Sequence, residues 1–144
     1  MHPILAGVLL LVAVSSCLSQ VADGPNRFVL ESFEGGSGPP LVMLGGGTGG
    51  ADEFIPLATL LAGNYRTIRL QTLNITRSRR KQPLPPDHSI QVEVAAVDDT
   101  LNRLGVRVRA DFVGHSLGAL IALQFALEHP ERVRTLTLAE PPGL

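Results

Sequence analysis

Hydrophobic and polar positions divide most of this chain into two kinds of segment. Short runs typical of buried strands stand at 40–44, 65–70, 110–113 and 134–139, with a more polar one at 27–31. Segments with apolar residues at helical spacing separate the later runs, at 54–61, 90–104 and 119–127. Strands that alternate with helices predict a parallel sheet covered by helices. We therefore expect an α/β fold with a mostly parallel sheet, helices on both faces and right-handed crossovers.

The segment 71–88 has no such periodicity, and we expect it to be a loop. It contains three prolines and a cluster of basic residues, Arg77, Arg79, Arg80 and Lys81. Such a cluster is typical of a solvated surface, and contact with a phosphate or an acidic lipid is the alternative.

The N-terminal segment differs in composition from the rest. Residues 4–14 form an apolar run of eleven residues, followed by small and polar residues. A helix needs about 20 residues to span a bilayer, whereas this length suits the apolar region of a secretory signal. We predict a signal peptide at 1–19, a single partial domain at 20–144, and export of the protein. The alternative is that 4–14 is a core helix or strand of the domain.

Cys17 adds a second feature to this segment. The run Val14–Cys17 resembles a bacterial lipobox, in which the cysteine is lipidated and anchors the protein to a membrane. An ordinary small residue near a cleavage site is the alternative. Because Cys17 is the only cysteine, the chain cannot form an intrachain disulfide.

Charge and composition exclude some functions. The formal net charge of −1 shows no basic excess, so nucleic-acid binding has no electrostatic support. We find no metal-ligand cluster and no organic-cofactor motif, so no cofactor is expected.

The pattern G-x-S-x-G at 114–118 carries the strongest chemical signal. It stands between a strand-like run and an apolar helical segment, which is the context of a nucleophile elbow. The sharp turn exposes Ser116, while Gly114 and Gly118 lie where the strand and helix backbones approach closely. His115 belongs to the same turn. The alternative is a serine in a generic strand–helix turn.

A glycine-rich run at 45–50 follows the apolar strand at 40–44. Acyl transfer builds negative charge on a carbonyl oxygen, and backbone N–H groups stabilise it. In an elbow enzyme one donor is the residue after the nucleophile, here Leu117, and the other comes from a loop after an earlier strand. A phosphate-binding loop is the rival interpretation, but the run has neither a Gly-Lys-Ser/Thr ending nor a G-x-G-x-x-G pattern.

These motifs together resemble the first half of the α/β-hydrolase fold family, over about 40–142. The matching stretches are the strand and glycine loop at 41–49, the elbow at 112–118 and the end of the following helix at 128–133. The resemblance implies Ser116 as nucleophile and the amides of Leu117 and Gly47 as oxyanion donors. One departure is Gly45, which stands where the family usually has a histidine.

The rest of a catalytic triad is less evident. The family order is nucleophile, acid, histidine. Glu140 follows the strand after the elbow helix and is our tentative acid, with a pocket-lining or solvated glutamate as the alternative. None of the four histidines is expected to be the base: they are His2, His88, His115 and His129.

The sequence therefore predicts a serine hydrolase that acts on a small ester or related acyl compound and is incomplete as given. The alternative is a non-catalytic remnant or a binding module on a hydrolase scaffold. We also expect the run at 134–139 to form an open sheet edge through which the chain associates with another piece of protein.

Overall fold

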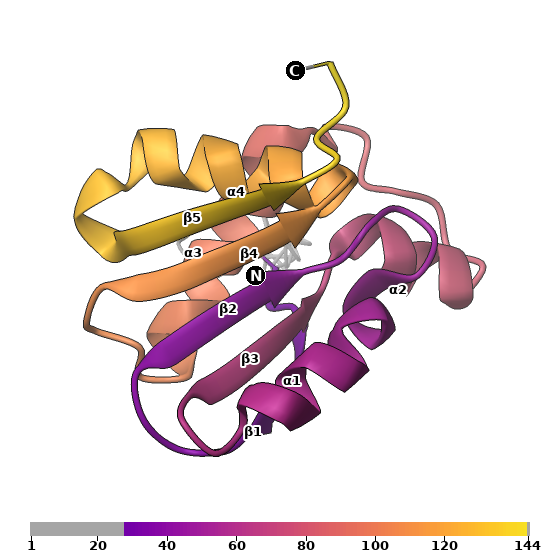
Figure 1. Ribbon diagram of the computed structural model, residues 1–144. Helices are drawn as coiled ribbons and strands as arrows, with labels where there is room; N and C mark the ends of the chain where they lie inside the picture. Colours follow the sequence, from indigo (N-terminus) through magenta and orange to yellow (C-terminus); the bar gives the residue numbers. More distant parts are fainter. Residues whose placement is uncertain (1–27, 144) are drawn as a thin grey trace, which may run out of the picture.

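The computed structural model describes residues 28–143 and contains one five-stranded sheet (Figure 1). The predicted signal peptide at 1–19 and Cys17 lie outside the described residues. The strand order is β1-β3-β2-β4-β5. The strands are β1 (Glu31–Gly35), β2 (Pro40–Leu44), β3 (Arg66–Gln71), β4 (Ala110–His115) and β5 (Val133–Ala139). Only β1 pairs antiparallel, with β3, so the sheet is mostly parallel as expected.

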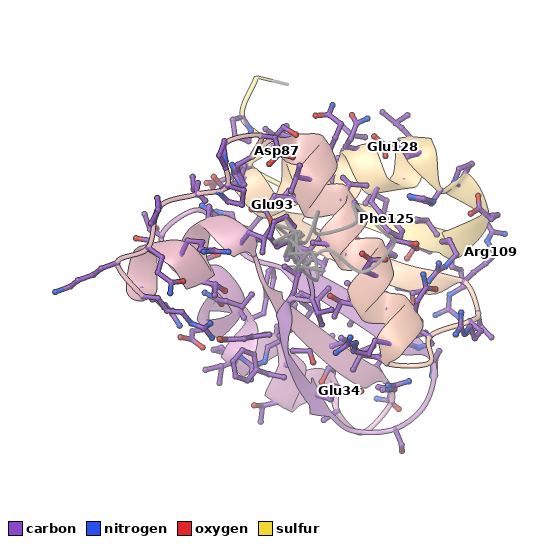
Figure 2. All side chains as sticks on the ribbon, turned by 180° about the vertical axis from the view of Figure 1, so that it is seen from behind. Glu34, Asp87, Glu93, Arg109, Phe125 and Glu128 are labelled. Carbon is purple, nitrogen blue, oxygen red and sulfur yellow. The ribbon has the colours of Figure 1, made fainter. Side chains whose placement is uncertain are left out.

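The helices cover both faces of this sheet, as predicted (Figure 1). They are α1 (Ile55–Leu61), α2 (Leu73–Arg79), α3 (Ile90–Arg103) and α4 (Leu117–Glu128), with short 3₁₀ turns η1 (Gly50–Phe54) and η2 (Pro130–Arg132). Helix α1 covers one face, and α3 and α4 lie side by side over the other (Figure 2). In residues 28–143 no helix has the length and apolar character needed to cross a bilayer.

Alternating residues of β2 separate the core into two parts. Val42 and Leu44 face the larger core beneath α3 and α4, while Leu41 and Met43 face a smaller one beneath η1 and α1. The larger core includes the stacked rings of Phe112 and Phe125, whose centroids are 4.9 Å apart. Strand β2 is thus buried on both faces, which explains its continuous apolar run.

Two expected features differ in the structure. The predicted loop 71–88 contains α2, because the buried carboxylate of Glu93 accepts hydrogen bonds from the first amides of this helix, a partner that the local sequence does not reveal. The expected strand at 27–31 is wrong by four residues: β1 spans Glu31–Gly35. Most of β1 is exposed at the edge of the sheet, so its apolar pattern is weak and its position is set by pairing with β3.

The elbow helix α4 is also less buried than its apolar sequence predicts. Its first two turns pack between β4 and α3, but Leu127 near its end is 68% exposed. The described residues therefore leave this one large apolar side chain of α4 mostly uncovered.

Candidate active site

The strand–corner–helix segment around Ser116, called the elbow below, has the geometry that its sequence predicts. Strand β4 ends at His115, α4 begins at Leu117, and Ser116 between them has φ 51° and ψ −120°. A residue other than glycine rarely adopts these backbone angles, so the surrounding structure must hold Ser116 in them. The Ser116 amide donates to the Ala139 carbonyl at 2.9 Å, and the Ser116 carbonyl accepts from the Ala119 amide at 2.9 Å. The corner is therefore fixed by β5 on one side and by α4 on the other.

The two flanking glycines are required by close backbone contacts. A Cβ on Gly118 would lie 2.0 Å from the carbonyl oxygen of Leu44, and one on Gly114 would lie 2.5 Å from the oxygen of Gly118. Any side chain at either position would displace backbone atoms. This crowding explains the spacing of the motif, because strand, corner and helix fit only without these side chains.

The glycine loop passes directly beside Ser116. Strands β2 and β4 are parallel neighbours, so the loop after β2 and the elbow after β4 meet at the same edge of the sheet. A Cβ on Gly46 would lie 3.4 Å from Cβ of Ser116, and one on Gly47 would lie 3.8 Å from the side chain of Leu117. The structure therefore brings Ser116, Leu117 and Gly47 together.

Sequence reasoning missed Glu53, a residue of η1 that joins the loop to the elbow. Its Oε2 accepts a hydrogen bond from the Gly46 amide at 2.8 Å and lies 2.9 Å from Nδ1 of His115. Burial alone would raise the pKa of Glu53, but hydrogen bonds from Gly46, His115 and Gly49 outweigh it and lower that pKa. The only sequence signal for Glu53 is its place just before a predicted helix, where the helix dipole by itself favours a negative charge.

His115 lies between two carboxylates. Its Nε2 is 3.7 Å from Oε2 of Glu140, on the side away from Glu53. The hydrogen bond with Glu53 is the main cause that raises the pKa of His115, with a smaller contribution from the charge of Glu140. The imidazole is 38% exposed, so solvent screens part of these interactions.

The remaining predicted site residues lie in different places. Glu140 follows β5, has φ 48° and a side chain that is 88% exposed, and stands at the same edge as the elbow. His88 contacts Glu93 at 2.8 Å, and the His129 ring lies 4.8 Å from that of Phe125 near the far end of α4. His2 lies outside the described residues. The catalytic roles of Ser116 and Glu140 stay predictions.

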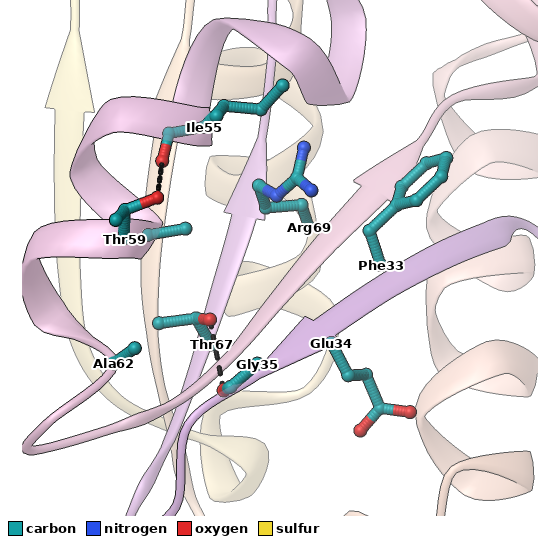
Figure 3. Close-up of a pocket in the computed structure, with 9 residues that line it drawn as sticks. Phe33, Glu34, Gly35, Ile55, Thr59, Ala62, Thr67 and Arg69 are labelled. Carbon is teal, nitrogen blue, oxygen red and sulfur yellow. Dashed lines mark hydrogen bonds between the residues drawn. The ribbon is translucent and has the colours of Figure 1, made fainter.

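Two depressions differ in their relation to this site. One of about 490 Å³ adjoins the elbow and is lined by Glu53, Phe54, His115 and Ala139. Another of about 290 Å³ lies between α1 and the strands β1 and β3, where the Arg69 guanidinium stands 5.1 Å above the Phe33 ring (Figure 3). Of these two, only the first is lined by a residue of the elbow, His115, the neighbour of Ser116, so it is the candidate substrate site. Among residues 28–143 no three His, Cys, Asp or Glu side chains are grouped to hold a metal ion.

Comparison with known proteins agrees with this geometry. A family model described as alpha/beta hydrolase fold matches residues 39–144. The protein named "Putative carbamate hydrolase RutD" from Stutzerimonas stutzeri (strain A1501) is 35% identical over 98 residues, which are 67% of this chain and 36% of that protein. The 2-hydroxy-6-oxo-6-phenylhexa-2,4-dienoate hydrolase of Comamonas testosteroni is 31% identical over 121 residues, 81% of this chain and 41% of that enzyme.

Among solved structures, one titled marine microorganism esterase superposes with a TM-score of 0.69 at 25% identity, covering 77% of this chain and 41% of that one. The chain thus spans about two fifths of the length of the relatives it matches. The family match covers four of the five strands, β2 to β5, together with the glycine loop and the elbow. The chain therefore belongs to the α/β-hydrolase fold family.

Proposed function

We propose that this chain provides the nucleophile and the oxyanion site of a serine hydrolase that acts on an ester or related acyl compound. The observation that carries the proposal is the conformation of Ser116, which stands on a strained corner beside the glycine loop. Strain of this kind persists only where the surrounding structure enforces it, and it is frequent at catalytic positions.

In the proposed reaction, Oγ of Ser116 attacks the carbonyl carbon of the substrate and forms a tetrahedral intermediate. The amides of Leu117 and Gly47 donate hydrogen bonds to the oxyanion. One well-placed donor of this kind lowers the activation free energy by about 2.7–4 kcal/mol. The leaving group departs to give an acyl-enzyme, which water then hydrolyses. A general base must take the proton of Ser116 during the attack and give it to the leaving group. The base must then take a proton from the attacking water and return one to Oγ of Ser116 as the acyl-enzyme breaks down.

That base is the part of the mechanism that the described histidines do not readily supply. His88 is paired with Glu93, His115 is hydrogen-bonded to Glu53, and His129 lies near the end of α4 opposite to the elbow. Complete turnover is therefore proposed for a form that brings a further histidine to Ser116, with Glu140 as the proposed acid. The absence of a base beside Ser116 among the described histidines also favours the second candidate function, a non-catalytic remnant or a binding module.

The substrate class follows from the depression beside the elbow. Phe54 and Ala139 give it an apolar lining suited to an acyl chain, while Glu53 and His115 supply polar groups. The relatives named as a carbamate hydrolase, a dienoate hydrolase and an esterase do not agree on one substrate. We accordingly limit the proposal to a small acyl compound.

Three further proposals concern location and partners. Export through the segment 1–19 and membrane anchoring through Cys17 rest on the sequence pattern alone. Association through the free edge of β5 is supported by the strand order, because β5 is the last strand of the described sheet.

A fluorophosphonate probe tests the nucleophile. We expect mass spectrometry to find one covalent adduct, on Ser116, which Ser116→Ala removes. Ser78→Ala is the matched control, because Ser78 is exposed on α2 and should leave the labelling unchanged. A folded protein, judged by circular dichroism, that takes no label at Ser116 would favour the non-catalytic alternative.

A further inference from the structure

Glu53 makes two hydrogen bonds with one oxygen, and they join the two halves of the candidate oxyanion site. Its Oε2 accepts from the amide of Gly46, the neighbour of Gly47, and from Nδ1 of His115, the neighbour of Ser116. The carboxylate therefore connects the loop after β2 with the elbow after β4.

We propose that Glu53 is a positioning residue that holds the glycine loop against the nucleophile elbow through His115. We call the hydrogen-bonded bridge from Gly46 through Glu53 to His115 the strap, and it is strongest while His115 is protonated. The proposal rests on the proposed function only for the catalytic meaning of the Gly47 amide. The strap itself is a statement about structure and ionisation.

The shape of the loop explains why such a strap is needed. Five of the six loop residues at 45–50 are glycines, so the loop has almost no side chains to anchor it and loses much conformational freedom when it is ordered. Its far end is secured independently, because the Ala51 amide donates to Oε1 of Gln71 at 2.8 Å and Arg69 donates to the Ala51 carbonyl at 3.0 Å. The part next to Ser116 is the part that Glu53 holds.

Packing supports the same role. A Cβ on Gly46 would lie 3.2 Å from both Oε1 of Glu53 and Nδ1 of His115, and one on Gly49 would lie 2.3 Å from Oε1 of Glu53. The Glu53 side chain is thus pressed against the loop at two points and is only 25% exposed. A side chain on the loop would displace it.

The charges around His115 set the pH range of the strap. The charged groups that face the imidazole are Glu53 from η1 and Glu140 from the segment after β5, while Phe54 and Ala139 are its apolar neighbours in the depression. The pKa of His115 is raised above its ordinary value of 6.5, and the pKa of Glu53 is lowered below 4.5. The ion pair is therefore lost when the pH rises through the pKa of folded His115, or falls through that of folded Glu53.

The test compares two variants that remove the same charge from opposite sides of His115. In Glu53→Gln the charged acceptor is lost, whereas Glu140→Gln removes a carboxylate that lies 3.7 Å away and does not contact the loop. NMR titration of the His115 imidazole gives its pKa in the wild type and in each variant. We expect Glu53→Gln to move that pKa down toward 6.5 and Glu140→Gln to move it clearly less.

Hydrogen exchange of the Gly46 amide provides the second measurement. At a pH where His115 is protonated in the wild type, Glu53→Gln should accelerate this exchange by about tenfold or more, since a hydrogen bond to a charged acceptor is lost. Glu53→Asp keeps the charge but shortens the reach, so we expect fast exchange of Gly46 with a His115 pKa above that of Glu53→Gln. This variant also serves if Glu53→Gln does not fold.

A His115 pKa that is unchanged in a folded Glu53→Gln, or that falls equally in both variants, would overturn the strap. Neither measurement requires chemistry at Ser116. If the titration and exchange behave as expected while the fluorophosphonate fails to label Ser116, the strap stands and the proposed function fails. If Ser116 is labelled but Glu53→Gln changes neither measurement, the proposed function is supported and the strap fails.

Discussion

At the scale of single residues, the spacing of Gly114, Ser116 and Gly118 follows from how closely three stretches of backbone approach one another. The carbonyl of Leu44 lies where a Gly118 side chain would stand, and Ser116 takes the one strained conformation that turns the chain from β4 into α4. The motif is thus a packing requirement as well as a chemical one. The two requirements can be separated by mutation.

Gly118→Ala should destabilise the protein by about 1–3 kcal/mol or more, because its Cβ would lie 2.0 Å from a backbone oxygen that can move only with β2. Gly63→Ala is the matched control: nothing lies within 4 Å of its Cβ, and its φ is not in the left-handed region. We expect this control to change the free energy of unfolding by less than about 1 kcal/mol. Urea denaturation measures both variants, and equal stabilities would contradict the packing argument.

At the scale of elements, α2 shows how one helix depends on another. Glu93 on α3 is buried, and its two carboxylate oxygens accept from the amides of Leu73 and Asn74 at 2.9 and 3.1 Å. These amides open α2 and would otherwise lack a helical partner. His88 contacts the same carboxylate, and Figure 2 shows Glu93 near one end of α3. The helix therefore exists because α3 supplies its cap.

Glu93→Gln should destabilise the protein by about 1–3 kcal/mol, since the amide group keeps one acceptor oxygen where the carboxylate had two. Hydrogen exchange within α2 should accelerate more than exchange within α4. Glu128→Gln is the matched control, because Glu128 is exposed and bonds only Gln124 on its own helix among the contacts described. Unchanged exchange in α2 for a folded Glu93→Gln would refute the capping role.

At the scale of the whole molecule, the sheet formed by residues 28–143 has β5 at one edge, where no other described strand pairs with it. The other sheet edge, β1, is short and carries Glu31 and Glu34, which oppose edge pairing. Strand β5 lacks acidic residues, and the exposed Leu127 lies on the adjoining helix. The unpaired edge of β5, with the exposed apolar side chain of Leu127 on the adjoining helix, favours association with another chain.

We expect the 144-residue chain to self-associate in a concentration-dependent way, as measured by sedimentation velocity. Thr137→Lys should shift the population toward monomer, because a charge on the exposed edge of β5 opposes strand pairing. Thr59→Lys adds the same charge on the exposed side of α1 and should leave the association unchanged. A stable monomer with cooperative unfolding at all concentrations would rule out this expectation.

The sequence by itself determined the order of strands and helices from β2 to β5 except for α2, the mostly parallel sheet and the strand–corner–helix context of Ser116. These features are local, because apolar periodicity and glycine spacing express how neighbouring residues pack and turn. The tertiary structure alone decided the position of β1, the existence of α2 and the bridge from Glu53 to His115. Each depends on a partner between 19 and 62 residues away, and hydrogen bonds across such separations leave no periodic trace in the chain.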